Sequence, residues 1–76
     1  MKDLISFIAK SLVDRPDEVM VSEINGTQSC VIELKVSKED IGKIIGKHGR
    51  TVMSIRTILS AASMKLNKRC VLDLLE

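Results

Sequence analysis

Apolar residues recur three or four positions apart in the first dozen residues: Leu4, Ile5, Ile8 and Leu12, with Phe7 beside them. This spacing predicts an amphipathic helix over residues 3–13, because positions three and four apart lie on one face of a helix. Pro16 then pushes the residue before it out of the helical region. We expect the helix to end there and to pack its apolar face, Phe7 included, on the core.

Three later segments alternate or concentrate apolar residues as strands do. Residues 19–24 are short and rich in β-branched residues, and Asn25-Gly26 after them is a strong hairpin signal. Residues 29–36 put Cys30, Ile32, Leu34 and Val36 on one face. Residues 69–75 repeat the pattern with Cys70, Leu72 and Leu74.

Two helices are predicted between the second and third strands. Ser37 to Asp40 resembles a capping box, with the Ser37 side chain accepting from a helix amide and Asp40 reaching back, so a short helix should run to Ile45. A second helix of about four turns follows from its apolar stripe, with Ile58 on the same flank: Val52, Ile55, Leu59, Ala62 and Leu66. The order α-β-β-α-α-β predicts an α+β fold, a three-stranded mixed sheet on three helices, formed as one domain by residues 1–76.

The stretch Ile41-Gly42-Lys43-Ile44-Ile45-Gly46-Lys47-His48-Gly49-Arg50 joins these two helices. Gly46 and Gly49 can adopt positive φ and allow another chain to come close. The amides that open the following helix lack internal partners and carry partial positive charge. Lys47, His48 and Arg50 add charge, so we interpret the turn as a clamp for a nucleic-acid backbone.

Charge is segregated along the chain, although the net charge is only +2. Residues 41–72 hold seven of the twelve basic residues and none of the ten acidic ones. Segregation of this kind is typical of a polyanion ligand. The alternative, a solvated helix face, usually mixes both signs.

Length and composition limit the remaining classes. With 76 residues and 45% hydrophobic content, the chain is near the lower limit for a single core, so oligomerisation is plausible. No apolar run is long enough for a membrane span, and the N-terminus does not resemble a targeting segment. We therefore expect a cytoplasmic protein without a membrane partner.

The sequence motifs give little support for an enzymatic function. A Walker A loop needs four residues between its glycines and Ser or Thr after Lys, whereas Gly42 and Gly46 are separated by three and His48 follows Lys47. His48 is the only histidine and has no companion for a metal site or for nucleophilic catalysis. We expect no enzyme, no cofactor, no metal and no small-molecule substrate. Cys30 and Cys70 lack CxxC spacing and are expected as buried, reduced thiols.

The element order and the glycine turn together resemble a type II KH domain, the bacterial form of this RNA-binding module. The whole chain is similar to the KhpA family of small stand-alone KH proteins. Residues 41–51 match its most recognisable segment, and Asp14-Arg15-Pro16-Asp17-Glu18-Val19 and residues 56–62 match as well. The resemblance implies single-stranded RNA as ligand, with about four nucleotides in a groove, and a role as RNA chaperone or post-transcriptional regulator.

A groove next to the turn would complete the site. We expect aliphatic side chains of the short helix on one side and Ile32, Leu34 or Val36 on the other. Without an aromatic stacking platform, and with a tight Asn25-Gly26 hairpin, sequence specificity should be low. Arg56, on a helix flank, either reaches phosphate or is solvated. The predicted RNA-binding residues are Ile41, Gly42, Lys43, Ile44, Ile45, Gly46, Lys47, His48, Gly49, Arg50, Val52 and Arg56. Single-stranded DNA stays open as a ligand.

The helix predicted over residues 52–66 has a second face, which points away from its apolar stripe. It carries two methionines flanked by small residues, which suits close packing with a partner: Met53, Thr57, Ser60, Ala61 and Met64. Scattered surface methionines are the alternative. The resemblance implies a homodimer and a heteromer with a Jag/KhpB-type KH protein, so the competing function is that of a dimerising protein-interaction module.

Overall fold

The computed structural model describes residues 1–75. It contains α1 (Lys2–Leu12), β1 (Met20–Asn25), β2 (Ser29–Lys35), α2 (Ile41–Ile45), α3 (Arg50–Lys65) and β3 (Arg69–Leu75). Short 3-10 turns occupy Pro16–Glu18, Lys38–Asp40 and Lys47–Gly49. The predicted α-β-β-α-α-β order is confirmed, and with it the arrangement expected of a type II KH domain.

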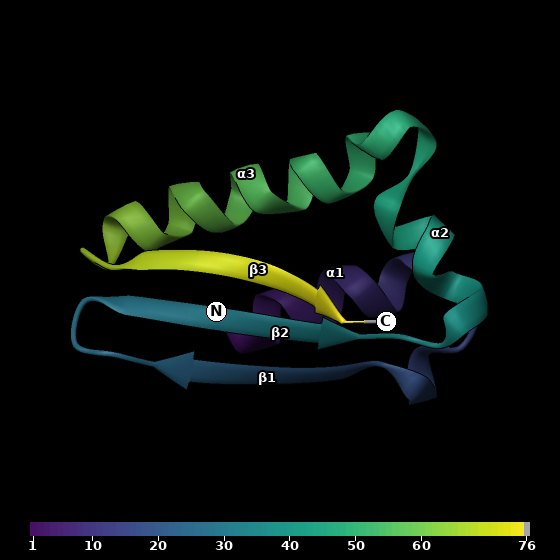
Figure 1. Ribbon diagram of the computed structural model, residues 1–76, viewed down its shortest axis with the longest axis horizontal. Helices are drawn as coiled ribbons and strands as arrows, with labels where there is room; N and C mark the ends of the chain where they lie inside the picture. The colour runs from purple at the N-terminus through teal and green to yellow at the C-terminus, as the bar shows by residue number, and fades with distance from the viewer. Residues whose placement is uncertain (76) are drawn as a thin grey trace.

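The three strands form one mixed sheet in the order β1-β2-β3. The β1–β2 pair is antiparallel and the β2–β3 pair is parallel, so β2 is the central strand. In Figure 1 α1 lies behind the sheet, α3 runs alongside β3, and α2 sits at the end where β2 and β3 terminate. No helix lies in front of the sheet in this view.

The core lies between the sheet and the helices. It is built from one side of α1, the inward faces of β2 and β3, and the buried stripe of α3, with Ile44 from α2: Ile5, Ala9, Cys30, Ile32, Leu34, Val36, Ile44, Val52, Ile55, Leu59, Cys70 and Leu72. Two expectations for α3 were wrong. Ile58 is exposed, and Leu66 lies beyond the end of the helix and is exposed as well.

The expectation that Phe7 packs on the core was also wrong, because its side chain is 72% exposed. The buried residues of α1 are Ile5 and Ala9. Phe7 is two positions from each, about 200° around the helix. The only aromatic residue of the chain therefore lies on the outer surface.

The two cysteines form a disulfide, which corrects the expectation of reduced thiols. Cys30 and Cys70 lie directly opposite each other in the parallel β2–β3 register, with their Cα atoms 4.5 Å apart. Both are buried. Their partnership depends on which strands become neighbours, which the alternation within each strand does not specify.

Helices long and apolar enough to cross a membrane do not occur within residues 1–75.

Candidate nucleic-acid interface

The turn between α2 and α3 has an unusual backbone. Gly46, His48 and Gly49 have φ values of 77°, 58° and 74°. A Cβ at Gly46 would lie 2.1 Å from Thr51 Oγ1, whereas one at Gly49 would meet nothing within 4 Å. Both φ and space thus favour glycine at position 46, whereas φ alone favours it at position 49.

Hydrogen bonds define where the turn begins and ends. The Gly46 N–H donates to the Gly42 carbonyl at 2.9 Å, which closes α2, and the Gly49 N–H donates to the Gly46 carbonyl at 3.2 Å. Helix α3 then starts at Arg50. Because the opening amides of a helix lack internal acceptors, the turn is adjacent to a partially positive helix end.

Three charged or polar side chains surround this turn. Lys47, His48 and Arg50 are all exposed. Within residues 1–75 none of them forms a side-chain hydrogen bond or an ion pair. They can therefore approach an anion without first leaving a protein partner.

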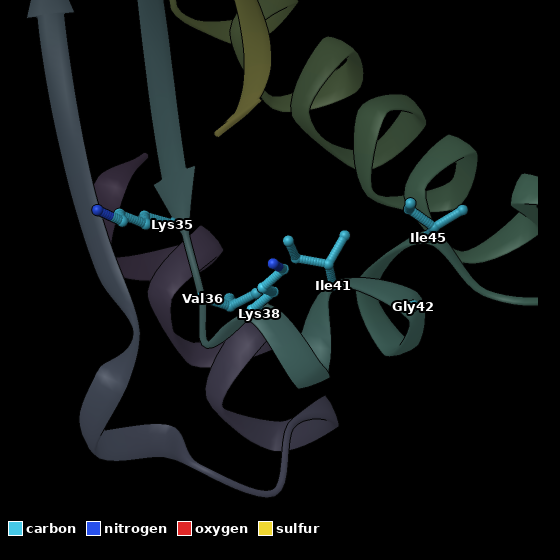
Figure 2. A pocket seen from close by; sticks show the side chains of 6 residues that line it. All are labelled: Lys35, Val36, Lys38, Ile41, Gly42 and Ile45. Carbon is cyan, nitrogen blue, oxygen red and sulfur yellow. The ribbon is translucent and has the colours of Figure 1, made fainter. Parts of the chain in front are cut away.

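A hollow of about 760 Å³ lies beside α2 (Figure 2). Its lining comes from α2 and from the end of β2 with the turn after it: Lys35, Val36, Lys38, Ile41, Gly42 and Ile45. The walls are mainly aliphatic, with two lysines at one side. Lys35 and Lys38 were missed by the sequence reasoning. The sequence does place a lysine before Val36 and another two positions after it. It does not show, however, that the fold brings this end of β2 next to α2.

The prediction of the residues that form the second wall of the groove was partly wrong. Ile32 and Leu34 are 0% exposed because they lie on the face of β2 that packs into the core, so their side chains cannot touch a ligand. Of the three candidates only Val36 lines the hollow. Ile44 and Val52 likewise belong to the core, so these two predicted site residues hold α2 and α3 in place rather than lining a groove.

The predicted capping box does not form. The Ser37 side chain makes no cap hydrogen bond, and its buried hydroxyl has no partner among the described residues. The Asp40 carboxylate instead accepts the N–H groups of Asp14 at 3.3 Å and Arg15 at 3.1 Å. A buried carboxylate needs such donors, since burying a charge without partners is costly. Asp40 thereby ties the start of α2 to the segment after α1.

Lys43 belongs to the same network. Its ammonium group donates to the Asp14 carboxylate and lies 4.0 Å from Asp40 Oδ1. The hydrogen bond with Asp14 raises the pKa of Lys43 above its ordinary value. Of the predicted binding cations, Lys43 is therefore engaged within the protein.

Arg56 is not brought to the turn. It lines a separate hollow of about 200 Å³ with Leu59 of α3 and with residues 70–72 of β3. The structure therefore unites Lys47, His48 and Arg50 with the α2 residues and leaves Arg56 on another part of the surface.

The outer face of α3 is as expected from its helical positions. Met53 and Met64 are 65% and 75% exposed. Thr57, Ser60 and Ala61 are exposed beside them. A shallow hollow of about 520 Å³ is lined by Arg50, Met53, Ser54, Thr57 and Ile58.

Comparisons with known proteins cover the whole chain. A family model described as KhpA/KhpB, KH domain, matches residues 2–74. The chain is 57% identical over 75 residues to a protein of Clostridium acetobutylicum named RNA-binding protein KhpA, which covers 99% of this chain and 100% of the relative. Proteins of the same name from Clostridium perfringens and Aquifex aeolicus are 52% and 49% identical over 75 and 76 residues, covering 99% and 100% of this chain and 100% and 96% of the relatives. No solved structure matches.

Proposed function

This chain belongs to the KhpA/KhpB family of KH domains, and from that premise we propose that it binds single-stranded RNA in the cytoplasm with low sequence specificity. In this proposal the turn at Gly46–Gly49 holds the RNA backbone and the hollow beside α2 holds bases. The bound RNA would serve post-transcriptional regulation or RNA chaperoning. The relatives' printed name supports RNA as the ligand.

One observation carries the proposal. A backbone with positive φ at Gly46, His48 and Gly49 is followed directly by the start of α3. Lys47 within this turn and Arg50 after it have no ion-pair partner among residues 1–75. Phosphate is favoured at a helix start because amide groups and the helix dipole both stabilise negative charge there. The same spot has no side chain at Gly49 to block the approach of a phosphate.

The hollow beside α2 supports the placing of bases. Ile41, Ile45 and Val36 offer aliphatic contact, while Lys38 can donate to phosphate or to base acceptors. The Lys35 side chain points toward β1 and away from α2 (Figure 2). Phe7 lies on α1, outside this lining, so stacking on an aromatic ring contributes nothing there. Aliphatic contact distinguishes the four bases poorly, which is why we propose low specificity.

The test is fluorescence anisotropy with a short unstructured RNA. We expect Lys47→Asp with His48→Asp to weaken binding at least about tenfold, because two acids would face the phosphates. With three or four phosphates contacted, the log–log salt slope should be about −2 to −3 for a single strand. Lys2→Asp with Thr27→Asp is the matched control, since it changes the net charge equally on exposed residues outside the site.

Unchanged affinity in the folded Lys47/His48 double variant would contradict the proposal. A DNA strand of the same sequence is measured in parallel, because no group of the site identifies a contact to the 2′-hydroxyl.

A second candidate function is a dimerising protein-interaction module that uses the outer face of α3. The observation that favours it is the exposure of Met53 and Met64 beside a shallow hollow. A homodimer, or a heteromer with a Jag/KhpB-type protein, would cover that face. Size-exclusion chromatography with light scattering on wild type and Met53→Glu tests it, and a monomer in both would contradict it.

A further inference from the structure

One face of the sheet is left uncovered by the helices of residues 1–75 (Figure 1). The residues of this open face follow an ordered pattern. Alternate residues of each strand point outward. The register of the three strands then arranges these residues in rows across the sheet: Ser29 with Arg69, then Ile24 with Val31 and Val71, then Ser22 with Glu33 and Asp73, then Met20 with Lys35 and Leu75.

The second row is apolar over all three strands. Ile24 is 57% exposed and Val71 is 50% exposed, with Val31 half-buried between them. An apolar strip that crosses a sheet and is bordered by charges on both sides is typical of a contact surface.

The charges on either side of this strip are opposite in sign. Glu33 and Asp73 lie directly opposite each other in the β2–β3 register, an arrangement of like charges that destabilises a sheet. Arg69 lies on the other side of the strip. In the described part of the chain Glu33, Asp73 and Arg69 all lack ion-pair partners.

We propose that this open face binds a second copy of the chain, sheet against sheet. A two-fold axis along the row of Ile24, Val31 and Val71 reverses the strand direction of the partner. Both charged rows are about 6.8 Å from that axis, two residues along the strand. The reversal therefore places Arg69 of each copy over Asp73 of the other and packs the two apolar strips together.

The same pattern argues for a second copy rather than a basic peptide. A basic peptide satisfies Glu33 and Asp73 but sets like charge against Arg69, whereas a second copy satisfies both signs at once. The surface is distinct from the α3 face that carries Met53, so the two contacts do not compete.

The area predicts a weak complex. The axis brings three of the four rows into register, and on three strands these cover roughly 14 Å by 20 Å, on the order of 280 Å² per copy. The total is below the roughly 1,200–2,000 Å² of stable interfaces. We therefore expect a dissociation constant between about 0.1 and 1 mM, which local concentration on a shared RNA strand would offset.

The test is sedimentation equilibrium on Met53→Glu protein, in which the α3 face is blocked, at low salt. Arg69→Asp and Asp73→Arg should each weaken self-association about tenfold, because each sets like charges face to face. The double variant Arg69→Asp/Asp73→Arg should restore it to within about threefold of the parent. Lys10→Asp, which changes a charge on α1, is the matched control and should leave association unchanged.

Circular dichroism and thermal melting confirm that each variant is folded. A parent that stays monomeric at about 1 mM would overturn the proposal. A folded double variant that fails to recover association would overturn it too, and so would binding of a basic peptide without self-association.

Discussion

The two ends of the molecule contrast sharply (Figure 1). At one end the β1–β2 hairpin meets the turn between α3 and β3. The Gly26 N–H donates to the Ser29 carbonyl at 2.7 Å within the hairpin, and the Arg69 N–H donates to the Gln28 carbonyl at 2.9 Å, which joins the hairpin to the start of β3. The Cys30–Cys70 disulfide lies next to them. A backbone hydrogen bond and a covalent bond therefore join the chain across this stapled end.

The other end, the clamp end, contains α2 and the turn from Gly46 to Gly49. Here three residues in a row of four have positive φ, and the cations beside them are unpaired within the described chain. Strained backbone persists only where its surroundings fix it, and here the Gly46 N–H donates to the Gly42 carbonyl and the Gly49 N–H to the Gly46 carbonyl. The two ends therefore differ in how they are held: bonds join the chain across the stapled end, whereas the clamp end presents a positive-φ turn with exposed cations at its surface.

The largest expected effect comes from breaking the staple. Reduction of the disulfide should lower the free energy of unfolding by about 4 kcal/mol, because a loop of sequence separation 40 regains its freedom in the unfolded chain. Urea denaturation with and without a reductant measures it. The variant Cys30→Ala/Cys70→Ala should show no response to reductant. Titration of two free thiols in untreated protein would contradict the disulfide.

At the clamp end, Gly46→Ala should cost about 3 kcal/mol of stability, since its Cβ meets Thr51 and its φ is positive. Gly42→Ala is the matched control within the same stretch. Its Cβ meets nothing within 4 Å and it lies in a helix, so stability should rise by up to about 1 kcal/mol. Equal effects of the two substitutions in denaturation curves would show that the turn is not tightly packed.

Asp40→Ala should cost about 2 kcal/mol, because the amides of Asp14 and Arg15 lose their acceptor. Asp40→Asn keeps one oxygen acceptor and should recover part of the loss. Amide hydrogen exchange at Asp14 and Arg15 should accelerate in the alanine variant while residues of β1 stay protected. Uniform acceleration throughout the chain would instead indicate general destabilisation.

The smallest effects are those of pH, and they differ between the ends. The Asn25 amide donates to Glu23 and lowers its pKa, so this contribution to stability is present above pH 4.5 and is lost as pH falls through the lowered value. The raised pKa of Lys43 gives a contribution present below pH 10.5 and lost as pH rises through the raised value. The melting temperature should be measured as a function of pH for both variants. Glu23→Gln should reduce the pH dependence on the acid side, and Lys43→Met should reduce it on the alkaline side.

The sequence predicted those parts of the molecule that depend on local patterns. The order of elements, the span of β3 and the glycine turn follow from periodicity and from residues that tolerate positive φ, and the structure has them all. Long-range features could not be read in the same way. The disulfide and the wall formed by Lys35 and Lys38 depend on which strands become neighbours and on where they end.

The capping box failed for a related reason. Ser37 and Asp40 have the spacing of a cap, but the chain after α1 supplies backbone donors from 25 and 26 residues away, and these bind the Asp40 carboxylate. A local rule cannot include a competitor that arrives through tertiary packing. Phe7 illustrates the same limit, since its exposure depends on where α1 rests on the sheet.

The disulfide has a topological consequence for the degradation of the protein. With Cys30 joined to Cys70, residues 30–70 form a covalent ring that contains all of α2, the clamp and α3. A protease or unfoldase that pulls one terminus through a narrow pore can extend only the segment outside the ring. At the disulfide, two segments of the chain must then enter the pore side by side. A cut inside the ring also leaves both fragments attached. The oxidised chain therefore resists threading at the segment that we propose holds RNA.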